Sequence, residues 1–452
     1  MRYGRRCPLC HCVQSGYILF SGQFLFQSLS HDDVYQKAMF FLTLLEATST
    51  SQRVFWTPSK KLKYLTYTND ANNNRIPHFS YVGFKHGNYS KPITSVLVTT
   101  LYPPKGDATA YIQNAINAMA SKPLDVNGFR GTILLKKGTW YVANTIYPSI
   151  SGVVIQGEGN GADPTASTVI VANGVNSGQS AVFYVGNSNI NWYASNAQTL
   201  ITSQFVGLSA FKFQVQSVGG YKIGQSILIV YPANQAWLNS VNRGGTYSDT
   251  PWGLGFPNVC YLRKITFIDP TTNTMFIDSP TFEKMDASIS QPYIIPFDDS
   301  KVVKNVIIRN LNIQIVSAIK DPQDQNHAQN GIIIDGSEDV WVYKCTISGF
   351  VRSGVVTYTS TRVSVTETAS VDPIGQDTTD NFYNFSVERN SQLILFAHNF
   401  ARGGRHQYVV NGMATASGVV FFDSTSINPS AVDESHRGWS TGILYDYMCN
   451  LN

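Results

Sequence analysis

Gly106-Asp107-Ala108-Thr109 begins the stretch that decides the fold, and Gly157-Glu158-Gly159 ends it. Apolar residues recur near one face of a helix between positions 108 and 120: Ala110, Ile112, Ala115, Ile116 and Met119. Three short apolar runs follow, each bounded by glycine, at 131–135, 138–141 and 152–156. This order predicts an all-β right-handed parallel β-helix, a single-stranded solenoid whose first rung is capped by an N-terminal helix.

Similar apolar runs return along the second half of the chain. They lie at 305–313, 339–347, 362–365, 392–395 and 418–422. Their separations of roughly 23 to 34 residues fit coils of about 20 to 25 residues with loops inserted. In such a coil, side chains of successive rungs align, so the outer face of one sheet can bind an extended chain.

The regular spacing is interrupted between about residues 200 and 300. Strand-like runs at 211–215, 223–230, 261–268 and 274–278 predict a β-rich insertion packed on the coil. We therefore predict an N-terminal extension at 1–75, poorly ordered or signal-containing, and a β-helix domain at 76–447. A C-terminal tail would occupy 448–452.

Composition favours an extracellular type of β protein. Hydrophobic residues make up 43% of the 452 residues and charged residues only 14%, with 35 Gly, 24 Tyr and 25 Phe. The net charge of +4 gives mild attraction to polyanions but not the dense basic patch of a nucleic-acid-binding protein. No run of 18 apolar residues is present, so no membrane span is expected.

The N-terminal region gives a weak secretion signal. An apolar run at 39–45 precedes Ala47-Thr48-Ser49, which would act as a short signal if translation began at Met39. Asn88-Tyr89-Ser90 and Asn384-Phe385-Ser386 fit the glycosylation pattern of a secreted glycoprotein.

The cysteines do not predict a metal site. Cys7, Cys10 and Cys12 crowd into one short segment with His11, whereas zinc sites usually pair two separated pairs of ligands. Cys260, Cys345 and Cys449 are expected to be buried thiols.

These features together resemble the pectate-lyase superfamily of right-handed β-helix proteins, over roughly residues 76 to 447. The chain is most similar to a largely uncharacterised, mostly secreted branch with three His-containing loops. Those loops correspond here to Asp324–His327, Arg405-His406-Gln407-Tyr408 and Ser435-His436-Arg437-Gly438-Trp439. Relatives tend to read His-His-Arg-Trp in the third loop, so Arg437 replaces the second His and Gly438 takes the place of Arg. The motifs of well-studied pectate lyases and polygalacturonases are not visible.

The resemblance implies a polysaccharide lyase acting on an acidic glycan. β-Elimination needs a group that neutralises the uronate carboxylate, a base for the C5 proton and an acid for the leaving oxygen. Neutral His suits the base, and Arg provides a bidentate carboxylate clamp. The candidate catalytic residues are His406, Arg405, His436, Arg437 and His327. Tyr408 and Tyr445 could donate a proton, Trp439 could stack on a sugar, and Asp324 could contact substrate.

Two other classes of function remain open. A glycoside hydrolase would use a carboxylate pair drawn from Asp433, Glu434 and Asp335, with Glu338 and Asp339 close to Asp335 in sequence. Turn capping is the stronger interpretation of Asp335 and Asp339. A non-catalytic β-helix would bind glycan or form a structural surface.

The expected partner is an acidic polysaccharide, and the sequence leaves the oligomeric state open. No cofactor is predicted with certainty. Calcium is possible through Asp298, Asp299, Asp321 and Asp324, although no calcium-loop spacing is present.

Overall fold

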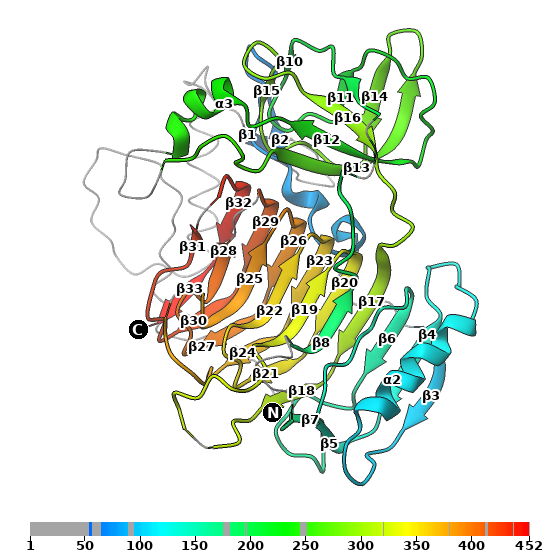
Figure 1. The fold of residues 1–452 in the computed structure, drawn as a ribbon, viewed down its shortest axis with the longest axis vertical. Helices are drawn as coiled ribbons and strands as arrows, with labels where there is room; N and C mark the ends of the chain where they lie inside the picture. The colour runs from blue at the N-terminus through cyan, green and yellow to red at the C-terminus, as the bar shows by residue number, and fades with distance from the viewer. Residues whose placement is uncertain are drawn as a thin grey trace.

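The computed structural model describes residues 54–56, 65–88, 95–174, 181–193, 195, 197–244, 251–319, 321–378, 380–411, 415–436 and 438–451. In this part of the chain, three long parallel sheets wrap around one apolar core (Figure 1). The chain runs through the first, second and third sheet in turn and then returns to the first sheet one rung further along. The predicted all-β, right-handed parallel β-helix class is confirmed.

The first sheet has nine strands, in the spatial order β3 (Leu97–Leu101), β4 (Gly131–Leu135), β6 (Val153–Gln156), β17 (Val303–Arg309), β20 (Ser337–Tyr343), β23 (Thr361–Thr366), β26 (Gln392–Ala397), β29 (Ser417–Phe422) and β32 (Thr441–Asp446). From β17 onward, successive strands of this sheet begin at residues 303, 337, 361, 392, 417 and 441. These intervals agree with the repeat expected from the sequence.

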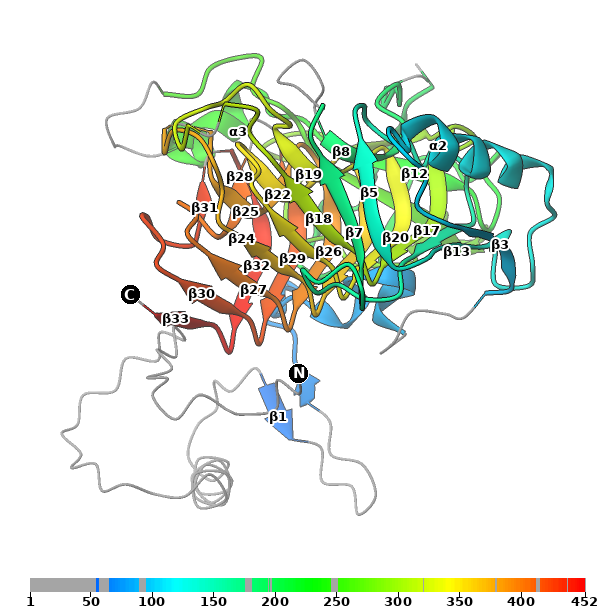
Figure 2. The same cartoon turned by 90° about the horizontal axis from the view of Figure 1, so that it is seen from below.

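The second and third sheets complete each rung (Figures 1 and 2). The second sheet has eight strands: β5 (Gly138–Val142), β7 (Thr168–Ala172), β18 (Asn312–Ile315), β21 (Thr346–Ser348), β24 (Ala369–Val371), β27 (Phe400–Arg402), β30 (Thr425–Ile427) and β33 (Cys449–Leu451). The third sheet has six strands: β8 (Ala181–Gly186), β19 (Asn330–Asp335), β22 (Ser353–Tyr358), β25 (Tyr383–Glu388), β28 (Tyr408–Asn411) and β31 (Glu434–His436).

Residues at equivalent positions of successive rungs stack inside the coil. The rings of Phe396 and Phe421 lie 5.1 Å apart, and those of Phe421 and Tyr445 lie 4.8 Å apart. Each strand sends alternate side chains inward, and Val and Ile fill most inward positions because they suit a pleated, buried surface. The core therefore extends along the coil axis as columns of like residues.

The predicted N-terminal cap is α2 (Thr109–Ala118), followed by η3 (Met119–Ser121). Ile112 and Ile116 are fully buried and belong to the same core cluster as the coil interior. Figure 1 shows α2 beside β3 and β4 at the end of the coil where the rungs begin. The helix thus covers apolar side chains that the first rung would expose.

The insertion predicted for about residues 200–300 is β-rich and forms two antiparallel sheets, one of six strands and one, β10 with β15, of two. Its elements are β9 (Thr199–Leu200), β10 (Phe205–Val206), β11 (Lys212–Gln214), β12 (Ser226–Tyr231), α3 (Gln235–Ser240), η4 (Asn242–Gly244), β13 (Val259–Asp269), β14 (Thr274–Ile277), β15 (Met285–Asp286) and β16 (Tyr293–Pro296). In Figure 1 it lies over the edge of the first sheet.

The strands of the first sheet share a left-handed residue at one position. The register skips this residue in every pair from β17 to β32, and its φ is between 55° and 64° in all six strands: Asn305, Asp339, Arg362, Leu393, Gly418 and Gly442. The insertion lies against the last two. Phe282 Cε2 lies 2.5 Å from where a Cβ on Gly418 would be, and the same ring lies closer still to that position on Gly442. Only glycine fits the two rungs that meet Phe282.

An N-terminal segment covers the outer face of the first sheet. It contains η1 (Phe79–Tyr81) and η2 (Phe84–Gly87), and the Phe84 N–H donates to Ser364 Oγ at 2.9 Å. Phe84 packs against Trp341 with 5.4 Å between ring centroids, which leaves Trp341 only 2% exposed. Trp341 is thus a packing residue, the interpretation that its apolar run favours.

The predicted boundaries need correction at both ends. Residues 449–451 form β33 and pair with β30, so they belong to the coil and not to a tail. Asn74 Oδ1 accepts the Leu208 N–H at 2.8 Å, so the region just before residue 76 is already bound to the insertion. Val54–Trp56 (β1) and Leu65–Tyr67 (β2) form a hairpin. The candidate signal near Met39 and the Cys7–Cys12 segment lie outside the described residues.

Two further expectations are wrong. Asn384 is fully buried and its Nδ2 donates to Ser370 O at 2.6 Å, so it is not available for glycosylation in the folded protein. Cys260 and Cys345 are buried free thiols as expected, but Cys449 is disulfide-bonded. Among the described residues, no helix is both long and apolar enough to cross a membrane.

Candidate functional site

Two of the three predicted histidine loops meet at the outer edge of the third sheet. His406 lies in the bend just before β28, and His436 ends β31, the strand that pairs with β28. Their ring centroids are 5.3 Å apart. Glu434 lies between them, with Oε1 2.6 Å from His436 Nδ1 and 3.7 Å from His406 Nδ1. We call His406, Glu434 and His436 the histidine cluster.

Hydrogen bonds fix the tautomers of both rings. Val432 O lies 2.6 Å from His406 Nδ1, and a carbonyl can only accept, so that nitrogen carries the proton. The Glu434 carboxylate plays the same part for His436 Nδ1. Each neutral ring therefore has its lone pair on Nε2. The His406 side chain is 5% exposed, whereas those of Glu434 and His436 are each 33% exposed, so solvent reaches the cluster from the His436 side.

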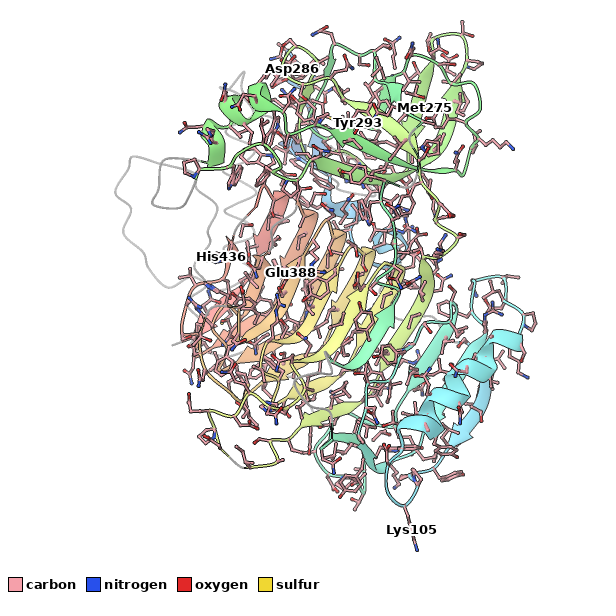
Figure 3. The ribbon with its side chains drawn as sticks, viewed as in Figure 1. Lys105, Met275, Asp286, Tyr293, Glu388 and His436 are labelled. Atoms are coloured by element: carbon pink, nitrogen blue, oxygen red, sulfur yellow. The ribbon has the colours of Figure 1, made fainter. Side chains whose placement is uncertain are left out.

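A row of polar side chains leads from the histidine cluster along the third sheet. In the strand register, Asp335 pairs with Tyr358, Tyr358 with Glu388 and Asn411 with His436; Glu388 and Asn411 are next in register after Val387 and Val410. Ile334, Val387 and Val410 belong to the core, so these alternating neighbours face outward. Figure 3 shows Glu388 and His436 on this part of the coil. We call Asp335, Tyr358, Glu388, Asn411 and His436 the outer row.

Glu388 is the most chemically unusual member of the outer row. Arg352 Nη2 donates to its two carboxylate oxygens at 3.2 and 3.1 Å, and Ser386 Oγ lies 3.2 Å from Oε1. Burial raises the pKa of Glu388 above its ordinary value, and the Arg352 charge only partly offsets this effect. A carboxyl group with a raised pKa beside an arginine is a candidate proton donor.

The neighbours of Glu388 are aromatic and polar. Arg389 lies over the ring of Tyr358, 4.7 Å from its centroid. Asn411 is 4% exposed, and its Oδ1 has no hydrogen-bond partner in the part of the chain that the structure describes. The sequence interpretation missed Glu388, Arg352 and Asn411. Aligning the rungs would have identified Glu388, because it is a charged residue two positions after outward-facing Ser386.

The Asp335 carboxylate joins neighbouring rungs, whereas the sequence favours a role in capping its own turn. Its carboxylate accepts from Tyr184 Oη at 2.6 Å and from Thr359 Oγ1. Asp433 accepts the Tyr408 N–H at 2.9 Å, and burial raises its pKa to about 6. Asp433 and Glu434 are adjacent in an extended segment, so their side chains point to opposite faces and do not flank one bond.

Two tyrosines expected at the substrate face inward instead. Tyr408 is fully buried, stacks on Phe385 at 5.2 Å and donates its hydroxyl to Thr425 O at 3.0 Å. Tyr445 stacks on Phe421, and its hydroxyl donates to Tyr408 O at 3.2 Å. Both occupy interior columns because they align with phenylalanines of the preceding rungs, so neither touches a ligand on the outer face.

Trp439 packs under the insertion. Its ring meets Trp237 at 5.6 Å and Trp252 at 6.1 Å, both edge-on, and its Nε1 donates to Glu283. Burial raises the pKa of Glu283 to about 7. These contacts make Trp439 a link between insertion and coil, in place of the sugar platform expected from the sequence.

The third histidine loop lies elsewhere. His327 precedes β19, three rungs from β28, which is about 14 Å along the axis at the usual strand spacing. It is 2% exposed, and its Nδ1 lies 3.3 Å from Asp324 Oδ2 beside an open pocket of about 710 Å³. Of the three candidate histidines, the structure therefore brings only His406 and His436 together.

Of the two predicted arginines, Arg405 belongs to the part of the chain that the structure describes. Arg405 is adjacent to His406, its side chain is half-buried, and it forms no ion pair with the carboxylates of the described residues. Arg437 lies outside the described residues.

A charged pocket of about 470 Å³ lies where η2, the insertion and the first sheet meet. Arg362 pairs there with Glu338 and donates to both oxygens of Asp339 at 2.9 and 3.1 Å. Burial alone would raise the pKa of Asp339, but the Arg362 charge outweighs it and lowers the pKa to about 2. Both carboxylates are thus ionised and paired, which suits joining segments better than transferring protons.

The residues present fit a transition metal better than calcium. Among the described residues, His406, Glu434 and His436 are the group whose ligand atoms lie within 4.8 Å of one another. The candidate calcium residues have local partners: Asp299 pairs with Lys304 at 2.6 Å, and Asp324 accepts from Ser317 at 2.7 Å. Asp298, Asp299, Asp321 and Asp324 form no such group in the described part of the chain.

Comparisons with known proteins give likeness in fold alone. No protein-family model and no curated protein matches the chain, so the resemblance to the pectate-lyase superfamily stands for the β-helix fold but not for family membership. Among solved structures, it is similar to the tailspike protein gp49 from Pseudomonas phage LKA1, with 14% identity and a TM-score of 0.41, over 75% of this chain and 52% of that one.

Two further structures illustrate the range of similar proteins. The Gp54 tailspike of Acinetobacter baumannii bacteriophage AP22, in complex with A. baumannii capsular saccharide, has 10% identity and a TM-score of 0.30, over 74% of this chain and 56% of that one. DFA-IIIase from Arthrobacter chlorophenolicus A6, in complex with GF2, has 12% identity and a TM-score of 0.32, over 77% and 66%. This chain thus matches about half to two thirds of the length of these proteins.

Proposed function

We propose that this protein is a secreted, carbohydrate-active β-helix protein that binds an acidic glycan along the outer row and cleaves it by β-elimination. The observation that carries the proposal is the pairing of His406 and His436 around Glu434, at the end of a row of polar and aromatic side chains. An extended polymer on the outer face of a parallel coil would contact successive rungs in order.

His436 is the proposed base. Its Nδ1–H donates to Glu434 at 2.6 Å, which leaves the Nε2 lone pair free, and a third of its side chain is exposed. In the reaction, Nε2 takes the C5 proton, the C5–H electrons form the C4–C5 double bond, and the C4–O bond breaks. Glu434 then stabilises the imidazolium, as a carboxylate does in other carboxylate–histidine pairs.

Two further roles complete the reaction. Arg405, next to His406 in the chain and free of ion pairs with the described carboxylates, is the proposed clamp for the uronate carboxylate. His406 in its protonated form is the proposed donor to the leaving oxygen. Arg437 and His327 keep only supporting roles in this proposal: Arg437 as a second cation and His327, with Asp324, as a distant contact.

The test is to incubate the purified protein with a panel of uronate polymers. A lyase creates a conjugated double bond, so ultraviolet absorbance should rise together with new chain ends. The His436→Ala variant should lose this activity, whereas His398→Ala should keep it, because His398 is an exposed histidine that also pairs with a carboxylate, Asp423, at 2.9 Å. Equal turnover in wild type and His436→Ala would rule out the assigned base.

A glycoside hydrolase is the second candidate, and Glu388 favours it. Glu388 has a raised pKa suited to an acid, and Asp335 lies two rungs away in the same row, about 10 Å at the usual strand spacing. This backbone spacing is slightly longer than the carboxylate separation of inverting enzymes, about 6.5 to 9.5 Å, so the two side chains would have to lean toward each other. New reducing ends without ultraviolet absorbance, lost in Glu388→Gln, would select this candidate. Binding without any product would select a non-catalytic glycan-binding protein.

A further inference from the structure

The histidine cluster has the composition of a transition-metal site. It offers two imidazole nitrogens and one carboxylate oxygen, all within 4.8 Å of one another. Two nitrogens and one oxygen suit zinc, cobalt or nickel, whereas calcium and magnesium prefer shells made of oxygen. Three protein ligands also leave a fourth position open in a tetrahedral site.

We infer that His406, Glu434 and His436 bind one divalent transition-metal ion such as zinc. This binding goes beyond the elimination reaction proposed above and does not depend on it. It adds an occupant for the cluster that the sequence does not predict.

The backbone prepares His406 for this role. The His406 Nδ1–H donates to Val432 O at 2.6 Å, and the side chain is only 5% exposed. The ring is therefore fixed with the lone pair for a metal ion on Nε2. Metal-ligating histidines commonly donate their second nitrogen to a backbone carbonyl or carboxylate in this way, which sets the tautomer and raises the basicity of the ligand.

The remaining adjustment is small and falls on the two exposed ligands. Zinc bonds of about 2.1 Å to tetrahedral ligands place the ligand atoms roughly 3.4 Å apart. The three ligand atoms already lie within 4.8 Å of one another. The hydrogen bond between His436 Nδ1 and Glu434 Oε1, 2.6 Å long, has to open so that both side chains can turn toward the ion. Glu434 and His436, each a third exposed, can rotate to close the widest separation, while His406 stays in place.

The chain contains natural comparisons for this cluster. His327 pairs with Asp324 at 3.3 Å, and His398 with Asp423 at 2.9 Å. Each pair lacks a second histidine among the described residues, and neither forms a group of three ligands. A histidine–carboxylate pair is therefore common in this protein, and the second imidazole distinguishes the histidine cluster.

Metal binding and base catalysis exclude one another at His436. A bound cation takes the lone pair that would accept the C5 proton, so saturating zinc should abolish elimination if the protein performs it. The inference is tested by binding alone. Failure to bind metal leaves the catalytic proposal standing, and absence of lyase activity leaves the metal site standing.

The experiment uses the full chain with the Cys449 disulfide intact, freed of metal with a chelator and titrated with Co²⁺. We expect one ion per chain with visible d–d absorption and no thiolate charge-transfer band, which separates this site from the cysteines at positions 7, 10 and 12. His436→Gln and Glu434→Gln should each weaken binding at least 10-fold, and His398→Gln should bind like wild type. Because His436 and Glu434 are partly exposed, both variants should fold, which thermal unfolding checks.

Three results would overturn the inference. The first is no Co²⁺ binding to folded wild-type protein, and the second is binding with a thiolate band only. The third is equal affinity in wild type, His436→Gln and Glu434→Gln. Zinc competition should displace the bound Co²⁺ from wild type and bleach the d–d bands.

Discussion

The rings of His406 and His436 lie 5.3 Å apart, although thirty residues separate them in the chain. The coil brings them together because the chain makes one full turn between them, so that β28 and β31 lie on adjacent rungs and pair with each other. Glu434 accepts from His436 Nδ1 at 2.6 Å and lies 3.7 Å from His406 Nδ1, so one carboxylate lies between two imidazoles. Spatial convergence of this kind is what a reacting centre or a metal site requires, and it is absent for His327.

The first prediction concerns the proposed base. On an accepted uronate polymer, His436→Ala should lower kcat by about 100-fold or more, because general base catalysis contributes that much. Glu434→Gln should lower kcat less and leave KM nearly unchanged, since Glu434 acts through His436. Steady-state rates by ultraviolet absorbance provide the measurement. A fall confined to KM would contradict these roles.

The second prediction concerns the contact between Phe282 and Gly418. Gly418→Ala places a Cβ against the Phe282 ring and puts alanine at a φ of 64°, so it should destabilise the protein by about 2 kcal/mol or more. Gly253 has an ordinary φ, and no atom lies within 4 Å of where its Cβ would be, so Gly253→Ala should be nearly neutral. Urea unfolding compares the two. Equal stability would show that the insertion does not press on this rung.

The third prediction concerns the Arg362 network. Arg362→Leu removes the buried partner that Glu338 and Asp339 share and leaves them only the partly exposed Lys264 and Lys85, so it should cost about 3 kcal/mol. Arg402 pairs with Asp372 at the surface, so Arg402→Leu should cost less than about 1 kcal/mol. The Asp339 pKa is lowered to about 2, so its stabilisation is present above its ordinary pKa of 3.8 and is lost as pH falls toward 2. Arg362→Leu should flatten this acid limb in pH-dependent unfolding.

The fourth prediction concerns Glu283, whose pKa burial raises from 4.5 to about 7. The folded state favours the protonated form of Glu283. The contribution of this group to the free energy of unfolding is therefore fully present below pH 4.5 and is lost as pH rises to about 7. Glu283→Gln should remove this decline in stability, which is on the order of 1 to 3 kcal/mol. It should also remove the change of Trp439 fluorescence with pH, because Trp439 donates to Glu283. Glu367 is largely exposed, and Glu367→Gln should leave both curves unchanged. A wild-type curve that is flat between pH 4.5 and 7 would refute the assignment.

The sequence predicted the coil because it shows two strong periods: the helical spacing of the cap and the regular return of short apolar runs. Helical spacing of Ile112 and Ile116 gave the cap, and repeated Val and Ile runs gave the rungs and the insertion. Cys449–Leu451 was missed as a strand because three residues are too few to show alternation. The pairing that makes it a strand comes entirely from the neighbouring rung.

The candidate site was predicted only in part. The sequence marked His406 and His436, but their approach depends on the bend before β28, which no local pattern specifies. Tyr408 lies two residues from His406, which suggests a place at the site, but its alignment with Phe385 of the preceding rung puts it in the core. The same alignment would have placed Tyr445 over Phe421 and would have brought Glu388 into view.

The outer row has a fixed spacing. Each rung contributes one side chain to the row, so neighbouring members are one strand separation apart, about 4.8 Å. Adding or removing a whole rung would change the distance between Asp335 and His436 by that amount and would preserve the parallel pairing of the remaining strands. The number of rungs thus sets the distance between members of the outer row, whereas the residue at each position sets the chemistry there.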